Sequence, residues 1–328
     1  MDPALLSRID ALKAARRAGA TEVGDLSDEE LSKWIDVKHF EEIDSTNSYV
    51  ERKFADFDLK KLTVVSTDSQ TAGRGTRGRS WHTATGQCAL LTYFVSFPPE
   101  CSTEFVNRNA ANATQVLALS TVTALQETAS ARGYKISFGV KWPNDVIADG
   151  GKIAGILARA EPSPGPRLDR LILGVGVNIN LPESDLDEIN GSRKAWPATS
   201  LLAAEAACAR KGKLGEPRVT TACSVEDFRK LLTLHFARSL KQFFVGGFAE
   251  LNERVREVDV YAGKRVHFRV SEEHVVNATY LCLNESGHIV LQHDDGKTTV
   301  YPSGEILPEE AVAAMGGSGE KNGEPTDE

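Results

Sequence analysis

The chain has 328 residues, of which 41% are hydrophobic and 26% are charged, and its formal net charge is −8 at neutral pH. This composition is typical of a globular protein, and no apolar run reaches the ~18 residues that a membrane-spanning helix needs. The acidic balance argues against sequence-independent binding of nucleic acids, which requires a basic face. The five cysteines have no short spacing and the N-terminus lacks a signal peptide's apolar centre, so we expect no structural zinc and a cytoplasmic location.

Residues 1–38 predict a helical N-terminal extension. Leu5, Ile9 and Leu12 recur at helical spacing, and Asp28–Trp34 could form a second short helix after Ser27. The region 39–258 mixes strands and helices with few strict βαβ repeats, so we predict an α+β domain built on a mixed sheet. Its predicted strands are Leu62–Thr67, Leu90–Phe97, Ile136–Lys141, Ile153–Ala160 and Leu171–Ile179. In the second of these, Leu91, Tyr93, Val95 and Phe97 alternate on one apolar face. Its main predicted helices contain Ala118–Ala129, closed by Gly133, and the stretch from Ser224, which with Asp227 resembles a capping box, to Gly246–Gly247.

From about residue 259, short predicted strands alternate with turn residues, a pattern typical of a small barrel. These strands are Arg265–Val270, Val275–Leu283, His288–Gln292 and Thr298–Tyr301. We assign 259–312 to this barrel. The remaining residues, 313–328, are rich in glycine, glutamate and lysine, which predicts a disordered tail.

The most informative segment is Ser69–Trp81, in which three arginines are interleaved with three glycines. Glycines let the backbone approach a ligand closely, and arginines offer paired donors to phosphate or carboxylate groups. Gly73, Gly75 and Gly78 also fit the Gly-x-Gly-x-x-Gly spacing of a dinucleotide site, but no apolar helix follows, so we reject that interpretation. A solvated loop without a ligand is the other alternative, which the arginines in an acidic chain disfavour.

A second segment, Lys141–Asp145, ends a predicted strand in a cation, a ring and a turn with two polar side chains. Asn144 offers both donors and an acceptor, as the edge of adenine requires. Asp145 could hold Mg²⁺ or orient a lysine. Taken alone, an ordinary β-turn also explains this segment.

Small residues mark two further strands. Ala154 and Gly155, which follow Lys152 in one predicted strand, leave room for a flat ligand. Lys152 itself is also explained as a surface lysine in a hairpin turn. Gly174 and Gly176 alternate along another strand and clear one face of it, where either a ligand or tight internal packing could fit.

Five segments together resemble, in order, the motifs of the biotin–protein ligase family. They are Ser45-Thr46-Asn47, Gln70–Gly75, Lys141–Asp145, Lys152–Leu157 and Gly174–Asn178. The resemblance is strong over 39–180 and weaker through Ala198–Leu202 and Ser303–Ile306. It implies a catalytic domain related to class II aminoacyl-tRNA synthetases, followed by an SH3-like barrel.

The resemblance also implies roles for individual residues. Catalysis would depend on Lys152, Arg74 and Lys141. The biotin-binding residues would be Ser45, Thr46, Asn47, Gln70, Gly73, Arg74, Gly75, Thr76, Lys152, Ala154 and Gly155. The ATP-binding residues would be Arg77, Arg79, Trp81, Lys141, Asn144, Asp145 and Asn178, with Asp145 as a candidate magnesium ligand.

The implied reaction forms biotinyl-5′-AMP and pyrophosphate from biotin and ATP with Mg²⁺, and then transfers biotin to a lysine of a biotin carboxyl carrier domain. A lipoate or octanoate ligase or transferase of the same fold is an alternative, which the loop Gly73–Trp81 and the terminal barrel disfavour. A biotin-responsive regulator is disfavoured by the acidic charge, and a catalytically dead biotin-binding module by Arg74 and Lys152. We expect no DNA or membrane partner, and the sequence leaves monomer and homodimer open.

Three features depart from the family's pattern. Thr76 stands where many members carry an arginine that is thought to help retain the activated intermediate. No arginine follows Ile306, although some members use one near adenine. Residues 1–38 are too short for the winged DNA-binding domain of the repressor-type members, so we expect none.

Overall fold

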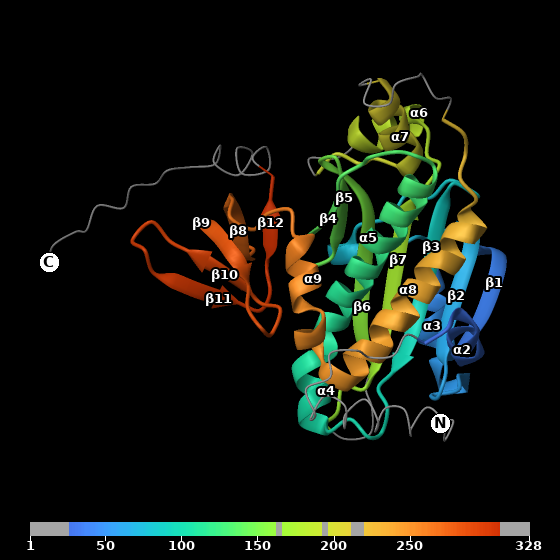
Figure 1. Ribbon diagram of the computed structural model, residues 1–328, viewed down its shortest axis with the longest axis horizontal. Helices are drawn as coiled ribbons and strands as arrows, with labels where there is room; N and C mark the ends of the chain where they lie inside the picture. The colour runs from blue at the N-terminus through green and yellow to red at the C-terminus, as the bar shows by residue number, and fades with distance from the viewer. Residues whose placement is uncertain (1–25, 162–165, 192–195, 211–219, 309–328) are drawn as a thin grey trace, which may run out of the picture.

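Figure 1 shows a computed structural model of the protein, which describes residues 26–161, 166–191, 196–210 and 220–308. The larger part is built on a seven-stranded sheet in the order β1-β2-β3-β7-β6-β5-β4. β1 and β2 are parallel, and the other neighbouring strands are antiparallel. The strands are β1 (Ile35–Ile43), β2 (Leu62–Gln70), β3 (Cys88–Ser96), β4 (Phe138–Lys141), β5 (Asp145–Ala148), β6 (Gly151–Glu161) and β7 (Arg170–Asn178).

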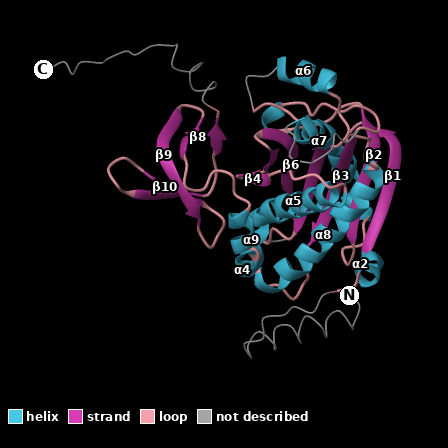
Figure 2. Cartoon of the chain, turned by 45° about the horizontal axis from the view of Figure 1, so that its top comes forward, coloured by secondary structure: helices cyan, strands magenta, loops and turns pink. Residues whose placement is uncertain are grey.

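Two long helices, α5 and α8, lie side by side across one face of this sheet (Figure 2). The helices are α2 (Asp28–Trp34), α3 (Thr46–Lys53), α4 (Thr103–Asn109), α5 (Ala113–Ala131), α6 (Glu183–Gly191), α7 (Leu201–Arg210), α8 (Val225–Gly246) and α9 (Asn252–Glu257). Short 3₁₀ turns are η1 (Phe54–Asp56), η2 (Thr76–Gly78), η3 (Ala110–Asn112) and η4 (Phe248–Glu250). Ser224 caps α8 as predicted, since its hydroxyl accepts from the Asp227 amide at 3.1 Å. None of the described helices is long and apolar enough to cross a membrane.

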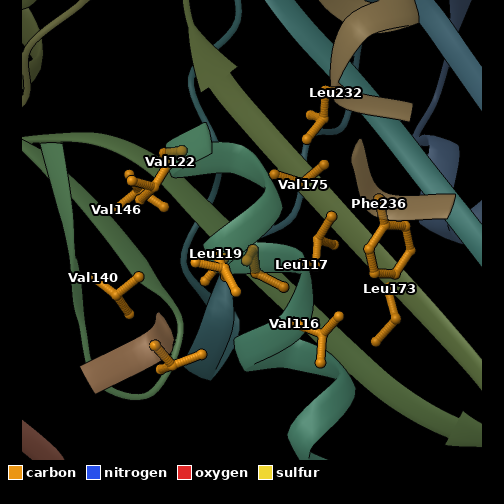
Figure 3. Packing of buried hydrophobic residues seen from close by; sticks show 14 of the residues in the cluster. Val116, Leu117, Leu119, Val122, Val140, Val146, Leu173, Val175, Leu232 and Phe236 are labelled. Carbon is orange, nitrogen blue, oxygen red and sulfur yellow. The ribbon is translucent and has the colours of Figure 1, made fainter. Parts of the chain in front are cut away.

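Alternation along the central strand β3 separates two packing layers. Leu91, Tyr93 and Val95 point into the main core with α5 and α8, which confirms the predicted apolar face. Figure 3 shows part of this core, formed by side chains of α5, α8 and β7. Phe94 points to the other face, where it packs with Val50 of α3 in a smaller cluster. The sheet therefore has one face filled by long helices and another that is partly covered by α3.

The N-terminal prediction is correct for one helix and wrong at the following segment. Asp28–Trp34 is helical, with Ser27 and Glu30 forming a capping box. Ile35–Lys38 are not part of a helical extension but begin β1, the edge strand of the large sheet. Among the described strands β1 pairs only with β2, and its residue Val37 is 60% exposed. Because an edge strand is less buried than a central one, the sequence of β1 lacks a continuous apolar run. The predicted elements within 1–25 and the predicted tail 313–328 lie outside the described residues.

The C-terminal part is a five-stranded antiparallel sheet in the order β11-β10-β9-β8-β12, consistent with a small barrel. Its strands are β8 (Arg265–Ser271), β9 (His274–Leu283), β10 (Ile289–Gln292), β11 (Thr298–Tyr301) and β12 (Glu305–Leu307). The first four confirm the prediction, and the mixed sheet with helices confirms the α+β class. This part is fixed to the larger one at Gly287, whose carbonyl accepts from Gln115 Nε2 at 2.9 Å and Trp142 Nε1 at 3.0 Å.

Candidate active site

A pocket lies on the face of the large sheet that carries α3. It is lined by residues from β2, the loop after it, α3, and strands β3, β5, β6 and β7. Its free volume is only about 50 Å³. The lining residues are Ser45, Thr46, Asn47, Gln70, Arg74, Gly75, Thr76, Trp81, Leu90, Leu91, Asn144, Asp145, Lys152, Gly155, Ile156, Leu157, Gly174, Val175 and Gly176.

One side of the pocket is a buried network of hydroxyl and amide groups at the start of α3. Ser45 caps the helix, and the backbone N–H and hydroxyl of Thr46 donate to Gln70 Oε1 at 2.8 and 3.1 Å. From β3, the Thr92 hydroxyl lies 2.8 Å from Thr46 Oγ1 and 2.6 Å from Asn47 Oδ1. Because each group holds the next, their orientation is fixed before a ligand arrives. Such a network can recognise the polar head of a small ligand.

Glycines clear the floor of the pocket, and a tryptophan fills the space. A Cβ atom built on Gly176 would lie 2.5 Å from the Trp81 indole, and one on Gly155 would lie 2.9 Å from the same ring. A Cβ on Gly174 would lie 2.3 Å from Asn47 Oδ1. Any larger residue would therefore collide with these side chains. The Trp81 indole occupies a flat slot that suits a ring, and its Nε1 is buried without a partner in the described structure.

Beside the slot, two lysines share one carboxylate. Lys152 Nζ lies 2.6 Å from Asp145 Oδ1, and Lys141 Nζ lies 2.9 Å from Asp145 Oδ2. Lys141 and Asp145 face each other across the β4–β5 hairpin, so the local fold brings them together. Burial opposes the charge on Asp145, but the two ammonium groups hold its pKa below the ordinary value of 3.8. Burial also lowers the pKa of Lys152, although Asp145 opposes that change.

The arginines of the loop after β2 are paired with carboxylates outside the pocket. Arg74 Nη1 lies 3.1 and 2.9 Å from the two oxygens of Glu51 on α3. Arg77 pairs with Glu305 of β12, and Arg79 Nη2 lies 3.8 Å from that same carboxylate. The loop thus connects the pocket to the C-terminal sheet. Its arginines can bind an anionic ligand when that ligand displaces the glutamates.

The comparisons with known proteins agree with this geometry. Residues 39–178, which contain most of the pocket, match the model of the Biotin/lipoate A/B protein ligase family. The match thus covers the part of the chain that forms the pocket, and less than half of the full sequence.

Relatives of this ligase family have similar sequences over different lengths. A biotin–[acetyl-CoA-carboxylase] ligase of Paracoccus denitrificans is 29% identical over 249 residues, covering 74% of this chain and 89% of that protein. The bifunctional ligase/repressor BirA of Bacillus subtilis is 27% identical over 198 residues, covering 60% of this chain and 55% of that protein. The chain thus spans about half the length of the Bacillus relatives it matches, with 42% and 55% covered.

Solved structures of the family share the fold. The biotin protein ligase of Aquifex aeolicus in complex with biotin and ATP has a TM-score of 0.61 and is 24% identical, covering 83% of this chain and 97% of that one. At this identity the likeness supports the architecture of both sheets, and the chemistry must be argued from the residues of this chain.

The structure brings together most of the residues that the family resemblance implied. Twelve of them line the pocket: Ser45, Thr46, Asn47, Gln70, Arg74, Gly75, Thr76, Trp81, Asn144, Asp145, Lys152 and Gly155. Six others do not line it: Gly73, Arg77, Arg79, Lys141, Ala154 and Asn178.

Each of these six has a different place. Ala154 packs in the main core, because neighbouring residues of a strand point to opposite faces and Gly155 faces the pocket. Asn178 donates from Nδ2 to the Thr199 carbonyl at 2.9 Å. Lys141 pairs with Asp145 but does not itself line the pocket. Gly73 accepts from the Trp81 amide and so closes the loop, while Arg77 and Arg79 reach Glu305.

Sequence reasoning missed three residues that hold the site. Thr92 supports Thr46 and Asn47 from the middle of an apolar strand, and a lone hydroxyl in such a strand was a usable signal. Glu51 and Glu305 hold the loop arginines but lie far from them in sequence, so no local pattern could have indicated these ion pairs, although Glu305 lies in the segment Ser303–Ile306 of the family resemblance.

Proposed function

We propose that this protein is an ATP-dependent biotin–protein ligase. One observation carries the proposal: two lysines flank Asp145 at the edge of a pocket whose floor is cleared by glycines. Once the Trp81 indole moves aside, a flat bicyclic ring fits above such a floor, and the carboxylate of the ligand's side chain would face Lys152. The name of the Paracoccus relative, a biotin–[acetyl-CoA-carboxylase] ligase, supports biotin as the acid.

The reaction explains why the cations are needed. Attack of the biotin carboxylate on the α-phosphate of ATP brings two anions together, and charge then develops on the leaving pyrophosphate. Lys152 and Arg74 are placed to neutralise these charges in a partly dry pocket. The product is a mixed anhydride, biotinyl-5′-AMP. A lysine amine of the acceptor protein then attacks its carbonyl carbon, and AMP leaves with the bonding electrons.

Binding requires a rearrangement of the loop Gly73–Trp81. With about 50 Å³ free, the pocket admits a ring only when the Trp81 indole leaves its place over Gly176 or slides along it. An anionic ligand would also draw Arg74 away from Glu51. The loop would then cover the anhydride and exclude water from it.

The described residues fit Mg²⁺ only as an ion carried by the nucleotide. They contain no group of three or more His, Cys, Asp or Glu side chains that could hold a metal. Asp145 remains the candidate ligand, and its carboxylate already contacts two ammonium groups. A magnesium ion bound mainly by phosphates and water needs few protein ligands and would add positive charge beside the reacting phosphate.

The acceptor in this proposal is the biotin carboxyl carrier domain of a biotin-dependent carboxylase in the cytoplasm. The Paracoccus relative is named for acetyl-CoA carboxylase, which supports this class of partner. The expected product is a carrier protein with one biotinyl group on a single lysine, which mass spectrometry of the carrier after the reaction would reveal.

Biotin-dependent exchange of labelled pyrophosphate into ATP tests the proposal, with biotin, lipoate and octanoate compared at equal concentration. Exchange with biotin alone would support it. Exchange only with lipoate or octanoate would favour the alternative activity, since the family model includes lipoate ligases. Exchange with none of the three acids would overturn the ligase proposal.

A further inference from the structure

A second cavity lies on the other face of the large sheet, between β1, β2 and α8. Its free volume is about 590 Å³, within the roughly 300–1,000 Å³ of small-molecule sites. Val64 and Leu91, which line it, belong to the main core on the α8 side of the sheet. Its apolar wall is formed by Ile35, Val37, Val64, Leu91 and Leu234. This wall suits the hydrocarbon part of a small ligand.

Three polar residues on this cavity form a relay. His39 of β1 is the register partner of Ser66 of β2, and Asp68 lies two residues further on the same face. The Ser66 hydroxyl lies 3.0 Å from His39 Nδ1, and His39 Nε2 lies 3.4 Å from Asp68 Oδ2. A carboxylate beside Nε2 favours the tautomer with its proton there. Nδ1 then accepts the hydrogen bond from Ser66.

The carboxylate of this relay is itself held in place. Arg229 of α8 donates from Nη2 to Asp68 Oδ1 at 2.8 Å and from Nη1 to the Thr67 carbonyl at 2.9 Å. The Arg229 side chain is 11% exposed and the Asp68 side chain is 35% exposed, so the pairing is partly shielded from water. Lys230 adds a second cation to the cavity lining, paired with Glu226 at 2.6 Å. A nucleophile, a base, an orienting acid and nearby cations therefore meet beside an apolar wall.

We propose that this cavity is a second catalytic site, at which Ser66 attacks esters of short aliphatic carboxylic acids. The Ser66 oxygen forms a bond to the ester carbonyl carbon while His39 takes the hydroxyl proton. The bond to the leaving oxygen breaks, and His39 returns the proton to the departing alcohol. Water then attacks the acyl–Ser66 ester with His39 again as base, which releases the carboxylic acid and restores the Ser66 hydroxyl. Asp68 and Arg229 are positioning residues.

The first experiment uses p-nitrophenyl butyrate as substrate and a fluorophosphonate as the covalent probe of the full chain. The probe should label Ser66, identified by peptide mapping. Ser66→Ala and His39→Gln should each lower hydrolysis by roughly 100-fold or more. His293→Gln is the matched control, because His293 lies 3.0 Å from the Thr299 hydroxyl but does not line the cavity. An unlabelled Ser66, or hydrolysis by Ser66→Ala equal to that of the wild type, would overturn the proposal.

A second experiment separates the relay from the fold. Asp68→Asn should lower kcat for the ester by about tenfold or more with little change in KM, because it disturbs the base and leaves the apolar wall intact. Pyrophosphate exchange should stay near wild type in all three variants, because the pocket of the proposed ligase lies on the other face of the sheet. Thermal melting should stay near wild type for Ser66→Ala and His39→Gln, whereas Asp68→Asn should melt at a lower temperature because Arg229 loses its counter-charge. An equal fall in exchange and hydrolysis would indicate a folding defect and contradict a separate site.

Discussion

Two groups of cations lie in or near the candidate active site, and the protein holds them differently. Lys141 and Lys152 share the buried Asp145, with the Lys141 side chain 2% exposed and the Lys152 side chain 20% exposed. Arg74 and Arg77 belong to a more exposed loop and are paired with glutamates of other elements. Buried charges cannot lose a partner without a large cost, whereas exposed ion pairs contribute about 0–1 kcal/mol and exchange readily. We call Lys141 and Lys152 the preset group, because their positive charge is fixed in place before substrates bind. The loop arginines, in contrast, can exchange their glutamate partners for anionic groups of the substrates.

The largest expected effect is on the preset group. Lys152→Ala should lower biotin-dependent pyrophosphate exchange by about 100-fold or more, because it removes a cation that faces the reacting carboxylate and phosphate. Circular dichroism should show a folded variant, since Lys141 still pairs with Asp145. Lys33→Ala is the control, because Lys33 forms an exposed pair with Glu29 outside the pocket. Wild-type exchange in Lys152→Ala would contradict its role.

The second prediction concerns the carboxylate between the lysines. Asp145→Asn should destabilise the protein by about 3–5 kcal/mol, because two buried ammonium groups lose their counter-charge. Urea denaturation measures the change in the free energy of unfolding. Asp294→Asn removes an exposed partner of Arg265 and should have little effect. Similar urea midpoints for Asp145→Asn and Asp294→Asn would show that the two lysines do not need the charge of Asp145 for the stability of the fold.

The same carboxylate predicts a pH dependence. The pKa of Asp145 is lowered on folding, so its contribution to stability is present above the ordinary value of 3.8 and is lost as the pH falls through the lowered one. The stability difference between wild type and Asp145→Asn should therefore stay constant above about pH 5 and shrink in stronger acid. A stability difference between wild type and Asp145→Asn that grew below pH 4 would contradict this prediction.

A substitution of Arg74 in the loop should weaken substrate binding more than it lowers stability. Arg74→Ala should raise the KM for ATP or biotin by about tenfold, the loss expected when one hydrogen bond to a charged group disappears. Its melting temperature should hardly change, because the Arg74 side chain is 46% exposed. A large loss of stability with unchanged KM would place Arg74 with the preset group.

The smallest effect is expected where the loop is anchored. Glu51→Gln should release Arg74 and lower the same KM by about twofold, while stability falls by no more than about 1 kcal/mol. Exchange kinetics over a range of ATP concentrations would measure this change. An increased KM would mean that Glu51 positions Arg74 for the substrate and does not compete with it.

Much of the fold was predictable because local patterns determine it. Alternating apolar residues indicated β3, and a capping serine with a terminal glycine indicated the limits of α8. The edge strand β1 escaped prediction because it is paired on one side only, and α6 and α7 fall in a stretch for which no element was predicted. The candidate site was predictable where residues are adjacent in sequence, as in Ser45-Thr46-Asn47.

The sequence by itself determined most of the segments that form strands and helices, and which chemical groups the site contains, since spacing and residue type act over a few neighbours. Only the tertiary structure decided how those groups pair. Arg77 meets Glu305 although 228 positions separate them, Trp81 lies over Gly176, and His39 reaches Ser66 from a neighbouring strand. Such contacts depend on the packing of two elements at once, which the pattern within either element does not encode.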